Sequence, residues 1–566
     1  MDGEPGLELL LAHADDHRPV LDRFDDAACH REGEGVEKTA KREHLADDSA
    51  SLEDLASQRW GLIVPQGERG EELLRRVQPL IDKRREDQGG HAIKIYRVPD
   101  RMTMLEAARW RKTEYDTGEG LQTDLPRYQL ILGDLHEVPL ALQLTQGMQG
   151  CVGRLAFDRD RDYSAYVEKL LSWERRPSAA ARGRSLFHTA HDSSRAIDTG
   201  YRELVEPGVV KARTWSKDRD DSKYPAASVD ELDPYTTDPD DLLAVVRDVP
   251  PSVLFTMSHG VGSPRRGWRS DDEQRALQGA MSFGLACMLT GRDIANTPFL
   301  PGGFWFMFAC FGAGTPGHGE SKYHHWLTGL TEHGEYNGNP KSVLAHLPGA
   351  NSRPFIAALP KAVLANPSGP LSFVGHVDLA WTYAFQQLDS PNVRSRPAQF
   401  LRMLREPLRG HRAGVAMRQI PLALGAVETE LTSHFDDDER HRRAGRRPRP
   451  DPRRGHLWML RQDLLGFVML GDPAARLPLT RPDPKATPDR DAVAPGHVVG
   501  SDQGPNLALS GRVDVDAIEL AIAKIIAEIA REEDLAGDLG VTRRTLTKLR
   551  MIYAKAGRRA IEDAVG

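Results

Sequence analysis

Short, almost uninterrupted apolar runs recur along the central part of the chain, and each ends at polar or turn-forming residues. Runs of this length are typical of strands that are buried on both faces of a sheet. Apolar residues with helical spacing lie between several of them, as in 70–85, 162–173 and 271–289. Strands that alternate with helices predict an α/β fold around a mostly parallel central sheet. The runs that we interpret as strands are 60–65, 92–98, 128–134, 151–155, 185–190, 252–258, 304–309, 371–375 and 465–470.

The same pattern divides the chain into regions. Residues 1–55 are rich in charged residues and show little apolar periodicity, which predicts a disordered or loosely helical segment. Residues 56–175 predict an N-terminal α/β subdomain, and residues 176–480 predict a larger α/β domain. The Pro, Asp and Gly content of 481–509 is typical of a linker. A strong apolar helical face in 510–566 predicts a small all-α module at the C-terminal end.

Two charged stretches, 213–240 and 434–454, interrupt the central pattern. We interpret both as solvated surface loops, because charged and turn-rich sequence seldom forms a core element. The arginine cluster in 440–454 also makes this stretch a candidate for self-cleavage.

Composition and charge narrow the classes of function. Of the 566 residues, 40% are hydrophobic and 28% are charged, which is an ordinary balance for a soluble protein. The net charge of −7 argues against a general nucleic-acid coat, although one small basic domain remains compatible with it. No run approaches the roughly 18 apolar residues of a membrane helix, so we expect no membrane partner. The acidic start, Met1–Pro5, lacks the basic residues of a secretory signal.

The cysteines show no paired spacing, and we interpret Cys151 and Cys287 as core residues. None has the CxxC spacing of a zinc ribbon, and we expect neither a metal nor another cofactor. Unpaired cysteines suit a reducing compartment in which a thiol stays free to react, so we expect a cytoplasmic protein. The four residues are Cys29, Cys151, Cys287 and Cys310.

Two of the apolar runs end on reactive side chains. Run 252–258 is followed by His259 and Gly260, and run 304–309 is followed by Cys310. In open α/β sheets the carboxyl ends of the strands are where ligands sit. Neighbouring parallel strands would therefore place the imidazole beside the thiol at one edge of the sheet, which is the arrangement of a cysteine nucleophile and its base.

Both residues also have a structural interpretation. A strand-end histidine is often satisfied by its surroundings, and cysteine is among the most frequently buried residues. The glycines nearby favour the functional interpretation. Gly260, Gly312 and Gly314 would let a substrate backbone approach and let amides point at a developing oxyanion.

The blocks Ser258-His259-Gly260 and Ala309-Cys310 resemble the caspase-like clan of cysteine peptidases, in which the histidine precedes the cysteine by about fifty residues. The clan includes gingipains, separase-type enzymes and CHAT proteases. Within it, the chain is most similar to the gingipain type over residues 56 to 480. The motifs that carry this further resemblance are Gly133-Asp134 with Val138-Pro139, Val152-Gly153-Arg154-Leu155, and Gly471-Asp472-Pro473.

The resemblance implies a caspase-like three-layer sandwich and a cysteine peptidase mechanism acting on a protein or peptide substrate. Cys310 would be the nucleophile that forms a thioester, and His259 would protonate the leaving amine. The backbone N–H groups of Gly260 and Cys310 would stabilise the oxyanion. No residue stands out in the sequence as a third member of a triad.

The stretch that follows run 371–375 is implied to line the pocket for the residue before the cleaved bond. A carboxylate at Asp378 would favour Arg or Lys there through a charge-assisted pair, and Trp381 would form a wall of the pocket. The structural alternative is that Asp378 caps a following helix and that Trp381 belongs to the core.

A second class of function stays open. A core without peptidase activity could serve as a regulatory protein that binds a protein partner or DNA through 510–566. Residues 539–550 resemble the turn and recognition helix of a helix-turn-helix, with basic side chains available for phosphates. Because such turns also occur in plain helical bundles, a protein partner is the preferred interpretation over DNA.

Overall fold

The computed structural model describes twelve stretches of the chain. The predicted linker 481–509 and the predicted helical module 510–566 lie outside them. The described residues are 9–21, 51–116, 125–176, 182–217, 223–232, 238–249, 251–284, 287–333, 340–349, 351–382, 397–446 and 451–479.

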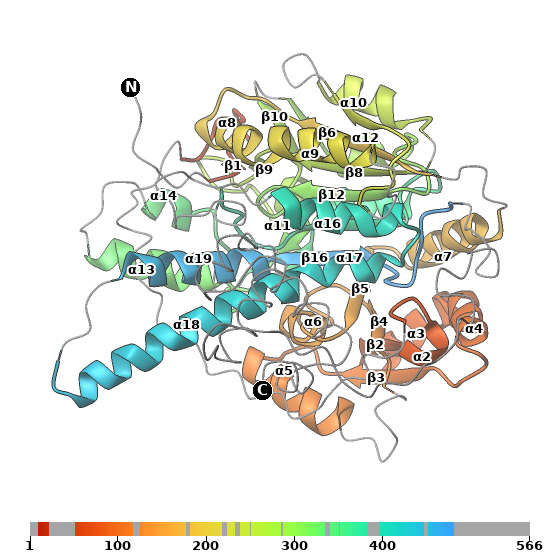
Figure 1. Cartoon of the computed structure of the whole chain (residues 1–566), viewed down its shortest axis with the longest axis horizontal. Helices are drawn as coiled ribbons and strands as arrows, with labels where there is room; N and C mark the ends of the chain where they lie inside the picture. The colour runs from red at the N-terminus through yellow and green to blue at the C-terminus, as the bar shows by residue number, and fades with distance from the viewer. Residues whose placement is uncertain are drawn as a thin grey trace, which may run out of the picture. The chain divides into compact units, whose positions relative to one another are not determined.

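One ten-stranded mixed sheet forms the centre of an α/β fold, with the strand order β3-β2-β4-β5-β16-β15-β12-β8-β6-β7. Neighbouring strands are parallel except β15 and β16, which are antiparallel. The strands predicted in 56–175 and in 176–480 thus share a single sheet, which Figure 1 shows from the orange β2–β5 to the yellow-green β6 and β8. The ten strands are β2 (Trp60–Pro65), β3 (Lys94–Val98), β4 (Tyr128–Leu132), β5 (Cys151–Leu155), β6 (Arg184–Thr189), β7 (Val229–Glu231), β8 (Ser252–Met257), β12 (Phe304–Phe308), β15 (Ser372–His376) and β16 (Phe467–Gly471).

Two small sheets accompany the large one. The first has the order β1-β9-β10-β11, and the second consists of β13 and β14. Their strands are β1 (Leu11–Ala12), β9 (Gly260–Val261), β10 (Met281–Gly284), β11 (Cys287–Leu289), β13 (Gly314–Thr315) and β14 (Phe355–Ile356).

Helices pack against the large sheet in two groups. α16 contacts α9 and α17, whereas α7 contacts α3, α4 and α15. Among the described residues, no helix is both long and apolar enough to cross a membrane. The α-helices are α2 (Leu55–Gln58), α3 (Glu68–Arg76), α4 (Gln78–Asp87), α5 (Met104–Trp110), α6 (Leu140–Gly147), α7 (Asp160–Arg175), α8 (Arg195–Gly200), α9 (Glu206–Ser216), α10 (Pro239–Val246), α11 (Asp271–Leu277), α12 (Gly291–Ile294), α13 (Lys322–His333), α14 (Pro340–Leu344), α15 (Ala358–Ala365), α16 (Pro397–Leu408), α17 (Ala413–Met417), α18 (Gln419–Arg443) and α19 (Pro452–Leu465), and π-helical turns span η1 (Arg111–Tyr115) and η3 (Tyr201–Val205).

Two helical predictions need correction. The predicted helix 70–85 is two helices that meet at Val77, because Pro79 lacks an N–H and fits only the first turn of a helix. The predicted helix 271–289 stops after α11 and continues as β10 and β11. Gly279 makes this break with a φ of +80°, and a Cβ there would lie 2.1 Å from the carbonyl oxygen of Phe311.

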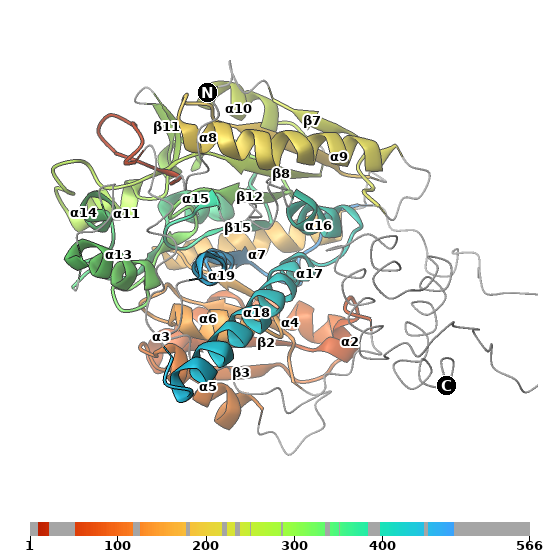
Figure 2. The same ribbon diagram turned by 60° about the vertical axis from the view of Figure 1, so that its left-hand side comes forward.

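The stretch 434–454 is not a solvated loop over its described residues. α18 continues to Arg443 and α19 begins at Pro452, and Figure 2 shows α18 as one long helix. Its charges pair with one another: Asp438 forms a buried ion pair with Arg454. The stretch 213–240 likewise contains the end of α9, all of β7 and the start of α10. Charged residues here stabilise helices through pairing, which local composition does not reveal.

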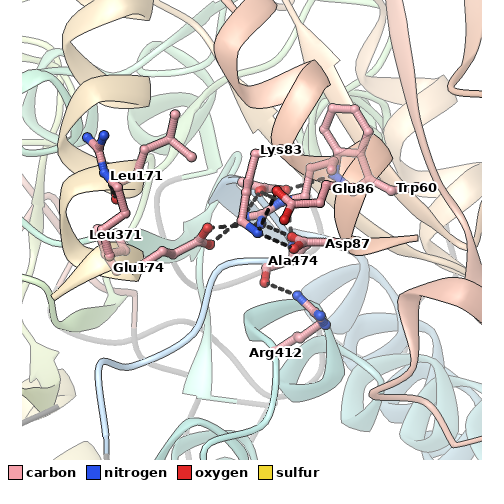
Figure 3. Close-up of polar contacts among 12 residues, drawn as sticks. Trp60, Lys83, Glu86, Asp87, Leu171, Glu174, Leu371, Arg412 and Ala474 are labelled. Atoms are coloured by element: carbon pink, nitrogen blue, oxygen red, sulfur yellow. Dashed lines mark hydrogen bonds and ion pairs between the residues drawn. The ribbon is translucent and has the colours of Figure 1, made fainter. Parts of the chain in front are cut away.

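A buried ionic network joins the N-terminal strands to the end of β16 (Figure 3). The Arg84 guanidinium on α4 is 1% exposed and lies 2.8 Å from the Asp472 carboxylate and 2.5 Å from the Glu174 carboxylate. Asp472 also accepts a hydrogen bond from the indole N–H of Trp60 at 3.0 Å. The Gly471-Asp472-Pro473 motif therefore serves as a structural junction between α4, β2 and β16.

Candidate active site

The predicted adjacency of the two reactive strand ends is confirmed at the level of the backbone. β8 and β12 are parallel neighbours, and Phe308 lies opposite Met257 in their register. The next amide, that of Ser258, donates to the carbonyl of Phe308 at 3.2 Å. His259 and Cys310 therefore leave the sheet at the same edge, one strand apart.

Gly260 fits this edge because it has no side chain. A Cβ at Gly260 would lie 1.8 Å from the carbonyl oxygen of Cys310, far inside a van der Waals contact. Any other residue would push the histidine strand and the cysteine strand apart. The glycine thus holds the imidazole and thiol segments in contact.

Two residues that the sequence analysis missed contact the imidazole. Nε2 of His259 lies 2.8 Å from Oγ of Ser194 and 3.5 Å from a carboxylate oxygen of Asp192. Both belong to the loop that follows β6, the other neighbour of β8. The signal was present, because Asp192 and Ser194 follow an apolar run in the same way as His259 does.

Cys310 is completely buried. Burial is the largest cause that raises the pKa of its thiol well above the usual value, and the charges of Asp463 and Asp378 act in the same direction. The backbone N–H of Ala380 donates to Sγ at 3.2 Å. The thiol is therefore neutral in this state of the molecule.

The N-terminal segment lies directly over this edge. β1 pairs in parallel with β9, as Figure 1 shows, and the carbonyl oxygen of Leu10 accepts from the N–H of Gly260 at 2.9 Å and from the N–H of Cys310 at 3.3 Å. The two amides predicted to form an oxyanion site thus converge on one peptide oxygen. The prediction of a disordered or loosely helical segment over 1–55 is wrong for residues 9–21, because non-local pairing orders them.

Asp378 and Trp381 lie in the segment that follows β15, beside Cys310. The Asp378 carboxylate is buried and accepts from the N–H of Leu379 at 2.8 Å, and burial raises its pKa to about 6. No described helix starts at Asp378, so it is not the cap of a following helix. The Trp381 ring packs against Tyr323 and Trp326, with centroids at 5.9 and 6.1 Å.

Trp381 also borders the N-terminal segment through its main chain. It forms an antiparallel bridge with Leu9, and its N–H donates to the Asp463 carboxylate at 3.0 Å. The ring of Trp381 thus belongs to the aromatic core, and its backbone lies against the N-terminal segment.

Acidification is expected to weaken the packing of the N-terminal segment. His13 and His346 face each other with ring centroids 5.0 Å apart. Burial lowers both pKa values, that of His346 from 6.5 to about 4. The pKa of His346 is lowered further by His13 and Arg265, and that of His13 by Arg265, whereas Asp15 raises both and Asp16 raises that of His13. Below pH 6.5 the unfolded state therefore binds more protons than the folded state. The stability that the neutral His346 contributes is complete above pH 6.5 and is lost as the pH falls toward about 4, the pKa of His346 in the folded state.

From the His346 shift alone, we expect the free energy of unfolding to be about 2 kcal/mol smaller at pH 5 than at pH 7. Urea unfolding at the two pH values measures this difference. The pH-dependent loss should shrink in His346→Asn, and an equal loss in both proteins would contradict the assignment.

Comparisons with known proteins find only distant likenesses. No protein-family model matches the chain, and no curated protein is similar to it in sequence. The Arg-specific cysteine proteinase gingipain R (RGPB) is 13% identical over 76% of this chain and 80% of that chain, with a TM-score of 0.41. A structure described only as a protease is 10% identical over 74% of this chain and 78% of that chain, also with a TM-score of 0.41.

A third match is the Saccharomyces cerevisiae separase–securin complex. It is 8% identical over 62% of this chain and 16% of that chain, with a TM-score of 0.26. Identities and TM-scores of this size do not define a family, so the function is inferred from the geometry of the site.

Proposed function

We propose that the chain is a cysteine endopeptidase of the caspase-like clan, with Cys310 as the nucleophile and His259 as its acid–base partner. The observation that carries this proposal is the convergence of the Gly260 and Cys310 amides on one carbonyl oxygen, at 2.9 and 3.3 Å. Converging amide donors beside a thiol are what an acyl-transfer site needs in order to stabilise an oxyanion. The oxygen that they bind belongs to a peptide group, which is the group that a peptidase attacks.

The chemistry would follow two steps. In the first, the Cys310 thiolate attacks the peptide carbonyl carbon, the bond to the amine breaks, and His259 gives the amine a proton. A thioester then links Cys310 to the acyl part of the substrate, which is the part that precedes the cleaved bond. In the second step, water gives a proton to His259 and attacks the thioester, which releases the carboxylic acid and restores the thiolate.

Asp192 and Ser194 would act as positioning residues for this cycle. Their contacts on Nε2 of His259, at 2.8 Å from Ser194 and 3.5 Å from Asp192, hold the imidazole in one orientation. A histidine held in this way is already oriented for proton transfer when the substrate binds.

The alternative is a protein that binds partners without catalysis. The complete burial of Cys310, which keeps the thiol neutral, is the observation that favours it. In that case the thiol edge would be a structural end of the sheet, and partners would bind elsewhere.

A fluorogenic peptide library and a thiol-alkylating probe separate the two functions. With the N-terminal segment displaced from the thiol, we expect the chain to cleave a subset of peptides, Cys310→Ala to cleave none, and Cys287→Ala to keep the activity. Cys287 is a suitable control because it is an exposed thiol on β11, so that the prediction of a core residue is wrong there, whereas Cys151 is buried as predicted. If no peptide is cleaved even with the N-terminal segment displaced, the peptidase proposal fails.

A further inference from the structure

Residues 9–12 lie as an added strand between the backbone of Ala380 and Trp381 on one side and β9 on the other, and we call this position the candidate groove. On one side, the Leu10 N–H donates to the carbonyl of Ala380 at 3.5 Å, and Leu9 bridges Trp381 in the antiparallel sense. On the other side, Leu11 and Ala12 pair in parallel with β9, and the Gly262 N–H donates to the Ala12 carbonyl at 2.6 Å. Main-chain pairing of this kind is how extended peptides bind to the edge of a sheet.

The register of this strand singles out one peptide bond. Of its carbonyl oxygens, that of Leu10 receives both the Gly260 and the Cys310 amides. The bond between Leu10 and Leu11 therefore lies where a cleaved bond would lie. The Leu10 side chain is completely buried and belongs to the main hydrophobic core, so its surroundings are apolar.

The segment is held in place beyond the groove by a hairpin. The Val20 N–H donates to the Leu11 carbonyl at 2.9 Å, and Ala12 bridges Pro19. Asp16 at the turn pairs with Arg265 at 3.2 Å. These contacts keep the local concentration of the segment high, so that it competes with any peptide from solution.

We propose that residues 9–12 are an intramolecular inhibitor in the substrate groove, with Leu10 in the place of the residue that precedes the cleaved bond. The inference rests on the proposed peptidase function and names its regulation and its substrate class. The groove selects an apolar residue such as leucine at that position, and not the basic residue that a carboxylate at Asp378 would favour.

The docked segment is expected to resist cleavage. With the groove filled, the buried thiol of Cys310 has a raised pKa and stays protonated, and a neutral thiol is a poor nucleophile. Displacement of the segment would bring water to the sulfur and so reduce the burial that raises its pKa, whereas loss of the Leu10 contact acts in the opposite direction.

The test places a charge on the buried side chain at position 10. Leu10→Glu should undock the segment, because a carboxylate cannot be buried in an apolar site without a partner. We expect cleavage of a peptide with leucine before the cut bond to rise about tenfold or more, since apparent affinity follows the fraction of open groove. Leu10→Met is the matched control, because it keeps an apolar side chain of similar size, and it should stay latent.

Alkylation of Cys310 by iodoacetamide reports on the groove without requiring catalysis. Faster alkylation in Leu10→Glu than in Leu10→Met supports occupancy of the groove, and if no peptide is then cleaved, it is the peptidase function that fails. Equal alkylation rates in Leu10→Glu and Leu10→Met would contradict the proposal that residues 9–12 inhibit the site. A higher rate on a peptide with arginine than on one with leucine overturns the apolar preference.

Two further measurements guard against misfolding and self-cleavage. A synthetic peptide covering residues 9–21 should inhibit Leu10→Glu again, whereas the same peptide with glutamate in place of leucine at position 10 should not. Failure of the first peptide to inhibit counts against the proposal. Intact mass should show an uncut bond between Leu10 and Leu11 in the wild-type chain, and a purified chain that begins at Leu11 would make the segment a substrate and overturn its role as inhibitor.

Discussion

Replacing Cys310 with alanine in the Leu10→Glu background is expected to lower peptide turnover by at least about 10⁴-fold, the scale seen when the nucleophile of an acyl-transfer enzyme is removed. The thioester cannot form without the sulfur, and the two amides that remain can only polarise the substrate carbonyl. The kcat and KM of a leucine-containing fluorogenic peptide measure the effect. The fall should appear in kcat, because substrate binding uses the groove and not the thiol.

If His259 and Cys310 act together, the effects of substituting both residues should not add. His259→Ala should reduce kcat by about 10²- to 10⁴-fold, because it removes the group that moves the proton. The double variant with Cys310→Ala should be no slower than Cys310→Ala alone, since residues that act as one unit are not additive. Two losses that multiply would show that the residues act independently, and an active Cys310→Ala would remove the proposed mechanism.

Arg84→Met is expected to lower the free energy of unfolding by about 3–5 kcal/mol, because it leaves buried carboxylates without their cation. Asp472 is completely buried and takes its ion pair from Arg84 at 2.8 Å. Urea unfolding measures the change. Arg85→Met provides the control: Arg85 is next in the sequence, its side chain is 47% exposed, and its pair with Asp82 lies at the surface.

Arg85→Met should lower the free energy of unfolding by less than about 1 kcal/mol, because exposed ion pairs usually contribute no more than that. Similar losses from both variants would show that the buried network adds no more than helix packing does. An unchanged stability in Arg84→Met would contradict the role of this network as a structural junction.

The strand-end chemistry of this chain was accessible from sequence because it depends on short-range pattern. An apolar run that stops at His259, and another that stops at Cys310, predict one sheet edge wherever their strands are neighbours. Asp192 carried the same signal after β6 and was overlooked, because a run of small polar residues resembles an ordinary turn. These residues could have been found by applying the same rule to every strand.

Other features could not be predicted locally. Leu11 and Ala12 form a strand of two residues, too short to show a period, and its hydrogen bonds come from residues about 250 positions away. The break at Gly279 likewise depends on the carbonyl of Phe311, which is far along the chain. Tertiary contacts decide both conformations, and local propensity carries little information about them.

The antiparallel joint of β15 and β16 has a mechanical consequence. The strands on either side of it belong to one hydrogen-bonded ladder, and the Arg84–Asp472 pair braces that ladder at the end of β16. A hinge motion between the strands on the two sides of this joint would have to break the ladder. If residues 9–12 inhibit the site as proposed, we therefore expect their removal to open it while the framework of the sheet stays in place.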